Sequence, residues 1–257
     1  PVPISDFLQE TVAVVTHPAI DREREGEHFS PRVVLGARPP VAGVASVPPF
    51  RWELRMPIIR GGGREGGRLC RPVMRRVAAW QGIACMEDVL AAWGEKARRL
   101  PLAYLKEQSP RTHVARLSEA AVEAVKEGAE LLVLEDQSAG PEERVIDPHL
   151  AVAAVDKALR EVYGEDGSSL RRRASLVLQA GGIRNVHDVM VALGFGAQAL
   201  APYAMIEQAT LEAPDPADPV SNLLDGLQKG MEKVISTLGI HELRGYSRLV
   251  SAIGVAP

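Results

Sequence analysis

The sequence predicts an α/β fold, in which parallel βα units form an incomplete barrel or an open sheet behind an irregular Pro/Gly-rich N-terminal arm. In the second half of the chain, short apolar runs alternate with amphipathic helical patterns, as in parallel strands joined by crossover helices. A complete eight-unit barrel takes about 250 residues, so a chain of 257 residues with such an arm is too short for one. We expect a single domain over residues 1–257, with an irregular and helical arm at 1–116 and a βα core at 117–257.

The arm has two readable parts. Apolar side chains at helical spacing over residues 3–15 predict an amphipathic helix, and Pro18 ends the segment that follows it. Residues 31–67 are rich in proline and glycine, which predicts a long, largely irregular segment. We therefore expect the arm to wrap around the core rather than to build it.

The core has clear start and stop signals for its helices. Asp147 and Pro148 form a cap and first-turn pair, and Asn185 caps a later helix. A stripe of leucine, methionine and isoleucine over 219–238 is typical of a helix packed on the core. In order, the expected elements are a helix from Ser118, a strand at 130–136, a helix from Asp147 to Gly164, a strand at 174–179, a helix at 185–194, a strand at 198–201, a short helix, the helix at 219–238 and a short helix in the tail.

Composition excludes several classes of protein. The net charge is -3, with 30 basic and 33 acidic residues, so nucleic acid is not an expected partner. No apolar run approaches the ~20 residues that span a bilayer, and we expect no membrane partner. The only cysteines, Cys70 and Cys85, are too few to ligate an iron–sulfur cluster and indicate a reducing cytoplasm.

Two glycine-rich stretches are candidate phosphate sites. GGGREG at 61–66 has dinucleotide-binding spacing, but Pro72 interrupts the helix that should follow it, so a flexible loop is favoured. AGGIR at 180–184 follows a strand and precedes a helix, where backbone amides and the helix N-terminus attract phosphate. Gly181, Gly182, Arg184 and Asn185 would form that site. The alternative is a tight turn that needs glycine for steric reasons alone, and both interpretations stay open.

Residues that carry catalysis are not evident in the sequence. The six histidines have no metal-binding spacing, and there is no nucleophile elbow or paired acid motif. We therefore predict no catalytic residue and no metal site.

Five segments of the chain, in order, resemble the central domain of glutamate synthase large subunits. VVTHPAIDREREGEHF resembles the family's VTNPPID segment and the charged helix after it. RWELRMPII and AVKEGAELLVLED are similar to two of its strands. VLQAGGIRNVHDVMVALGFGAQALAPYAMIE and GLQKGMEKVISTLGIHELRGYSRLVSAIGV resemble its later βα unit and its ending. These matches reach both ends of the chain.

The resemblance implies a noncatalytic connector between a glutaminase part and an FMN-binding synthase part, which also holds an iron–sulfur cluster. The connector itself is expected to bind no cofactor, and AGGIR is then a barrel turn kept after its ligand was lost. Thr16, His17, Pro18 and Asp21 match the segment near the ammonia passage, although His17 stands where the family usually has Asn. The alternative is an autonomous FMN- or phosphate-binding, barrel-like oxidoreductase.

Overall fold

A parallel sheet of four strands forms the centre of the molecule. The computed structural model describes residues 2–10, 22–39, 49–61, 71–211, 214–215, 217–246 and 253–255. The strand order is β4-β6-β8-β9, and all three pairings are parallel. Every residue of β6, β8 and β9 is buried, as expected for strands covered on both faces. The strands are β4 (Ala97–Pro101), β6 (Leu131–Glu135), β8 (Ser175–Gln179) and β9 (Ala199–Ala201).

The sheet is open, and in the part of the chain that the structure describes it does not close into a barrel. Beyond β9, an extended stretch of the arm continues the wall, because the Ile59 amide donates to the Leu200 carbonyl and the Leu200 amide donates to the Pro57 carbonyl. Ile58 and Ile59 are fully buried there. The fold is therefore a mixed α/β structure with an incomplete barrel.

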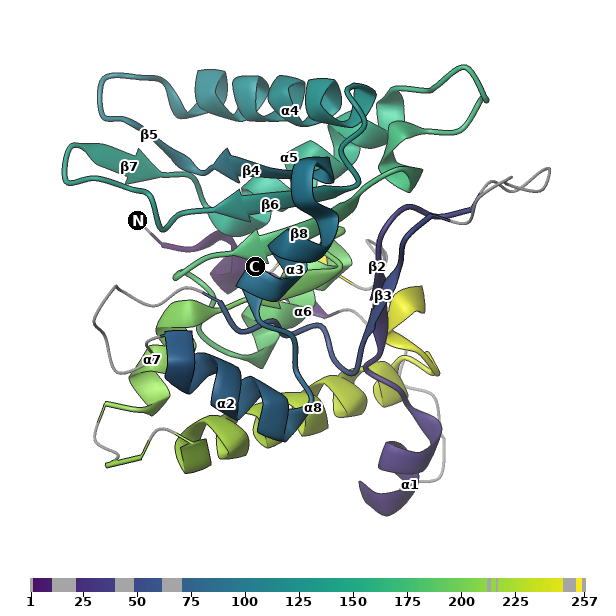
Figure 1. Ribbon diagram of the computed structural model, residues 1–257, viewed down its shortest axis with the longest axis vertical. Coiled ribbons are helices and arrows are strands. Elements are labelled where there is room, and N and C mark those ends of the chain that lie inside the picture. Colours follow the sequence, from purple (N-terminus) through teal and green to yellow (C-terminus); the bar gives the residue numbers. More distant parts are fainter. Residues whose placement is uncertain are drawn as a thin grey trace.

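Helices cover the sheet (Figure 1). Asp147 accepts hydrogen bonds from the amides of His149 and Leu150, and Asn185 accepts from the amide of Asp188, so both predicted caps are confirmed. α4 packs on α5, while α7 and α6 both contact α8. The helices are α1 (Arg22–His28), α2 (Arg71–Gln81), α3 (Met86–Trp93), α4 (Pro110–Lys126), α5 (Pro148–Glu161), α6 (Val186–Gly194), α7 (Tyr203–Ala209) and α8 (Ala217–Thr237).

Among the described residues, three antiparallel strand pairs lie outside the main sheet. β1 pairs with β10 and thereby joins segments from opposite ends of the sequence. β2 pairs with β3 inside the proline-rich arm, and β5 pairs with β7 beyond the main sheet. The strands are β1 (Leu8–Glu10), β2 (Val33–Leu35), β3 (Trp52–Leu54), β5 (Ala103–Leu105), β7 (Glu143–Val145) and β10 (Ile253–Val255).

Several local predictions are wrong. The helix expected over 3–15 is, in its described part, a 3-10 turn at Ile4–Phe7 followed by β1, because pairing with β10 overrides the helical pattern. The short helix expected in the tail falls mostly on residues 247–252, outside the described residues; the described parts on either side are the 3-10 turn Leu243–Gly245 and β10. α4 begins at Pro110, with Ser109 as its N-cap, rather than at Ser118.

Residues upstream of 117 contribute more to the core than the sequence indicated. β4 is a full member of the sheet and pairs with β6 along its whole length. Within the arm, Leu35 and Met56 are also buried in the same apolar cluster as the βα units. Although the arm is proline-rich, these apolar residues pack against the core.

Candidate functional site at the carboxyl edge of the sheet

The AGGIR turn lies where β8 ends, next to the end of β6. The Gly181 amide donates to Oδ2 of Asp136 at 2.9 Å, and the Tyr203 hydroxyl donates to Oδ1 of the same carboxylate at 2.8 Å. Asp136 directly follows β6, and Tyr203 opens α7. A carboxylate of the chain itself therefore takes the position that an anionic ligand would need at this turn.

Burial controls the electrostatics of this contact. Desolvation raises the pKa of Asp136 above its ordinary value, although hydrogen bonds from Tyr203 and Gly181 act in the opposite direction. Burial and the neighbouring Asp136 raise the pKa of Tyr203. Ionised Asp136 beside the Gly181 amide would repel a phosphate.

A steric contact explains Gly181 but not Gly182. A Cβ on Gly181 would lie 2.8 Å from the Tyr203 hydroxyl, closer than real contacts allow, whereas one on Gly182 would lie 3.4 Å from Cγ of Pro148, an ordinary contact distance. The two interpretations of this turn therefore separate: the observed contacts favour a tight turn that needs glycine for packing.

Arg184 forms a network with two carboxylates. Its Nε donates to Oδ2 of Asp188 at 2.9 Å, and its Nη2 donates to Oδ1 of Asp6 at 2.6 Å. The Arg184 amide also donates to Asp188. The Asp188 side chain is fully buried, whereas that of Arg184 is 43% exposed. The one cation that the sequence offered for phosphate binding is thus occupied by acids of the chain.

The N-terminal segment 4–6 covers the beginnings of α5 and α6. The Ile4 amide donates to Oδ2 of Asp147 at 2.9 Å, and Nε2 of His187 lies 3.0 Å from the Ser5 carbonyl oxygen, to which it donates. Ser5 is fully buried. Because both helices start at the carboxyl edge of the sheet, this segment covers the edge where open α/β folds bind ligands.

The two carboxylates that hold this segment have lowered pKa values. Burial alone would raise the pKa of Asp188, but hydrogen bonds from Arg184 and Ser5 outweigh it. Burial likewise opposes the shift at Asp147, where hydrogen bonds from His149, Ile4 and Leu150 lower the pKa. Both groups are therefore carboxylates at neutral pH.

His149 connects the first turns of α5 and α6. It is fully buried, and its Nε2 lies 3.0 Å from the Asp188 carbonyl oxygen. A carbonyl only accepts, so Nε2 carries a proton. Its Nδ1 lies 3.5 Å from Oδ1 of Asp147.

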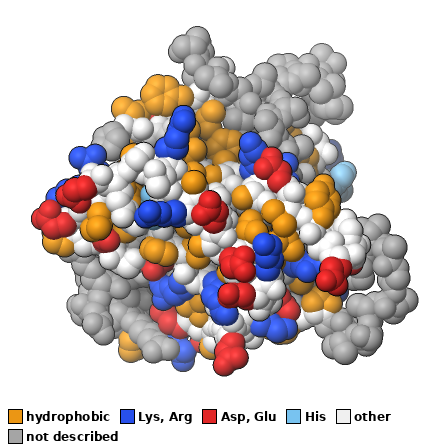
Figure 2. Space-filling model, turned by 90° about the horizontal axis from the view of Figure 1, so that it is seen from above, with side chains coloured by type: hydrophobic (Ala, Val, Ile, Leu, Met, Phe, Trp, Pro, Cys, Tyr) orange, Lys and Arg blue, Asp and Glu red, His pale blue; other side chains and the backbone are white. Residues whose placement is uncertain are grey.

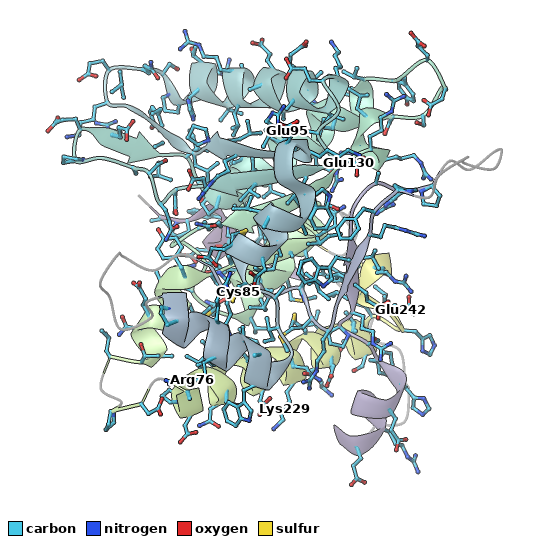
Figure 3. The ribbon with its side chains drawn as sticks, viewed as in Figure 1. Arg76, Cys85, Glu95, Glu130, Lys229 and Glu242 are labelled. Atoms are coloured by element: carbon cyan, nitrogen blue, oxygen red, sulfur yellow. The ribbon has the colours of Figure 1, made fainter. Side chains whose placement is uncertain are left out.

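Other candidate chemistry is sparse in the described part of the chain. No group of three or more His, Cys, Asp or Glu lies close enough to hold a metal ion in the residues that the structure describes. Cys85 precedes α3 near the middle of the molecule (Figure 3), and burial raises the pKa of its thiol. Buried Arg60 lies nearby, and desolvation lowers its pKa to about 10.

Some predicted residues cannot be located. Thr16, His17, Pro18 and Asp21 lie outside the described residues, as does GGGREG from residue 62 onward.

None of the described helices is long and apolar enough to cross a membrane. Acidic and basic side chains are interspersed over the face that α4 covers (Figure 2).

Sequence reasoning missed the acids that close the site. Asp136 has a recognisable signal, since it directly follows a buried strand, and Asp188 stands four residues after Arg184 on the same helix start. Asp6 and Tyr203 have no such signal, because they approach from distant parts of the chain.

Fold and site together define a βα-unit protein of incomplete-barrel type, whose usual ligand edge is closed by its own side chains. The chain belongs to the glutamate synthase central domain family, whose model matches residues 1–256. It is 25% identical to glutamate synthase [NADH] of Schizosaccharomyces pombe over 97% of this chain and 11% of that protein. It is 27% identical to the chloroplastic ferredoxin-dependent glutamate synthase of Spinacia oleracea, over 94% of this chain and 14% of that protein.

Three further proteins are similar to parts or most of the chain. The NADPH glutamate synthase large chain of Bacillus subtilis is 28% identical over 53% of this chain and 9% of its own length. The chain thus spans only a small fraction of the relatives it matches. Among solved structures, mandelate oxidase with benzoyl-formic acid matches 98% of this chain and 88% of its own, with TM-score 0.45 and 14% identity. The flavin-binding domain of baker's yeast flavocytochrome b2 matches 53% of this chain and 32% of its own, with TM-score 0.41 and 14% identity.

Proposed function

We propose that this chain is a noncatalytic connector in a glutamate synthase, between a glutaminase part and an FMN-binding synthase part. Membership of the central domain family supports the assignment to glutamate synthase. The small share of each relative that the chain spans supports the presence of neighbouring domains or subunits. On this proposal the complex works in glutamate biosynthesis in the cytoplasm.

The contact between Gly181 and Asp136 carries the noncatalytic part of the proposal. FMN binding at this turn would require the turn amides to accept a phosphate, and one of them already donates to Asp136. Arg184 would have to leave two carboxylates to balance the phosphate charge. We therefore place FMN and the iron–sulfur cluster in the neighbouring parts, and favour the connector over an autonomous FMN-binding oxidoreductase.

Flavin binding by the purified chain tests this proposal. The connector should be colourless near 450 nm, and added FMN should keep its free fluorescence. Arg184→Ala should leave this result unchanged and affect stability only. A yellow preparation, or FMN binding that Arg184→Ala abolishes, would support the oxidoreductase instead.

The segment with Thr16, His17, Pro18 and Asp21 is our proposed contribution to the ammonia passage. The test uses the complete glutamate synthase and measures ammonia released to solvent against glutamate formed from glutamine. His17→Trp, a bulkier side chain, should raise the fraction of ammonia released, while glutaminase turnover continues. Phe7→Trp, at an exposed position of the same terminal region, serves as the control. An unchanged ammonia fraction in His17→Trp would refute this role.

A further inference from the structure

A cavity of about 360 Å³ lies at the opposite end of the sheet from the AGGIR turn. Ala197 and Gln198, which precede β9, line this cavity, so it faces the amino ends of the strands. Its floor is apolar and buried. The floor residues are Val33 on β2, Leu193 on α6, Ala197, and Leu243 in the last 3-10 turn.

Three arginines line this cavity, and no acidic residue is among its described lining residues. Arg38 follows β2, Arg51 precedes β3, and Arg244 lies in the last 3-10 turn. All three are exposed. Arg244 pairs with Glu242, which does not line the cavity and lies beside the β2–β3 pair (Figure 3). This excess of positive charge is local, since the whole chain has a net charge of -3.

The cavity wall is built by specific contacts rather than by a loose loop. Gly36 adopts φ +112°, and a Cβ there would lie 2.3 Å from the Phe50 carbonyl oxygen, so only glycine allows β2 and β3 to approach this closely. The Gly36 amide donates to the Ser175 hydroxyl at 2.8 Å, which fixes the loop to the start of β8.

The Gln198 side chain is also held in place. Its Oε1 accepts from Nη2 of Arg171 at 2.7 Å and from the Leu176 amide at 2.8 Å. Both loop and side chain are therefore positioned before any ligand arrives, and such preorganisation lowers the cost of binding.

We propose that this cavity binds a small organic oxyanion, with its charged group at the arginines and its apolar body on the floor. Guanidinium groups bind carboxylate and phosphate oxygens through paired hydrogen bonds. The volume lies near the lower end of the range of about 300–1,000 Å³ for small-molecule sites, which fits a small molecule better than a protein segment. The inference goes beyond the connector role, because this cavity and the AGGIR turn lie at opposite ends of the sheet.

Calorimetric titration of the full chain tests the proposal. The probes are inorganic phosphate, the series acetate, butyrate and hexanoate, and butyl phosphate. Each added methylene should tighten binding about fourfold until the floor is covered. Comparison of butyrate with butyl phosphate then distinguishes the two head groups, and inorganic phosphate should bind more weakly than butyl phosphate.

Substitutions assign the binding to the arginines. Arg51→Ala should weaken binding at least about tenfold, since it removes a charge-assisted hydrogen bond, and Arg51→Lys should weaken it less. Arg32→Ala is the matched control: it removes the same charge from the same pair of strands, but Arg32 pairs with Glu53 and does not line the cavity. Both positions are exposed, so both variants should fold, which thermal unfolding verifies. The proposal fails if no probe binds, if chain length has no effect, or if Arg32→Ala and Arg51→Ala weaken binding equally.

Discussion

Asp136, Asp147 and Asp188 are three carboxylates at one edge of the sheet, yet their pKa values shift in different directions. The pKa of Asp136 is raised because burial outweighs the effect of the hydrogen bonds that its carboxylate accepts from Gly181 and Tyr203. The pKa values of Asp147 and Asp188 are lowered because these carboxylates accept more hydrogen bonds. For Asp188 these include hydrogen bonds from the Arg184 guanidinium. The number and charge of the donors, rather than burial alone, therefore decide the direction.

The raised pKa of Asp136 gives a pH prediction with a definite sign. The folded protein holds this proton more tightly than the unfolded chain, so ionised Asp136 lowers the free energy of unfolding at neutral pH. That cost disappears as the pH falls through the folded pKa toward the ordinary value of about 3.9. Asp136→Asn should remove this dependence. As the pH falls over this range, the free energy of unfolding of the wild type should rise relative to that of Asp136→Asn.

Urea unfolding at a series of pH values measures the difference. Tyr203→Phe provides the companion variant, because loss of the hydroxyl removes a donor that stabilises ionised Asp136. In Tyr203→Phe, the rise in the free energy of unfolding on acidification should therefore begin at a higher pH than in the wild type. If the difference between wild type and Asp136→Asn does not change with pH, Asp136 is not held by burial as described.

Gly181→Ala tests the steric role of the turn. The new Cβ would lie 2.8 Å from the Tyr203 hydroxyl, and such overpacking costs about 1–3 kcal/mol. Tyr203→Phe removes the clashing atom, so the double variant should lose less stability than the sum of the two single changes. A strictly additive double variant would show that the two residues do not compete for the same space.

At the scale of elements, Arg171 joins three parts of the fold at the amino end of the sheet. Its Nε donates to Oδ1 of Asp156 on α5 at 2.6 Å, and its Nη1 and Nη2 donate to the carbonyls of Ala174, before β8, and Gly196, before β9. Arg171 and Asp156 are almost fully buried. Loss of one partner therefore leaves a buried charge without its counterion.

Asp156→Asn should lower the free energy of unfolding by about 3–5 kcal/mol, as expected when one member of a buried ion pair is removed. Arg160→Ala is the matched control, because Arg160 contacts the same carboxylate at 2.8 Å but its side chain is 49% exposed. Exposed pairs contribute about 0–1 kcal/mol. Guanidinium unfolding measures both variants, and equal losses would contradict a dominant role of the buried pair.

Prediction of elements from sequence succeeded where the signal is local. The caps at Asp147 and Asn185, and the strands that became β6 and β8, are specified by neighbouring residues, and each is found close to its predicted position. β1 and β10 were not predictable in this way, because each becomes a strand only by pairing with the other across almost the whole chain. Periodicity cannot report a partner at that distance.

At the scale of the whole molecule, the same limit applies to the candidate site. The sequence predicted a glycine turn between a strand and a helix at AGGIR, but not which side chains of the chain contact it. The closure comes from the end of β6, the start of α7 and the N-terminal segment 4–6, which meet only in the folded chain. A turn motif gives the geometry of a ligand site, and the rest of the fold decides whether a ligand can use it.

This closure should make the molecule sensitive to acid. Asp147 and Asp188 have folded pKa values below the ordinary value, so the unfolded chain takes up protons first as the pH falls. Their contribution to stability is complete above about pH 4 and is lost as the pH falls through their folded pKa values. The free energy of unfolding should therefore fall steeply below pH 4. The Ile4 amide, which donates to Asp147, should lose hydrogen-exchange protection in the same range.

The double variant Asp147→Asn/Asp188→Asn separates this cause from general acid unfolding. It should be less stable than the wild type at pH 7, with a flatter dependence on pH below 4, and its Ile4 amide should exchange quickly at every pH. Asp166→Asn is the control, because hydrogen bonds from Ser168 and Arg173 also lower the pKa of Asp166, but this exposed carboxylate follows the end of α5, away from the closed edge. A double variant that keeps the acid slope of the wild type at moderate salt would show that these two carboxylates do not hold the edge closed.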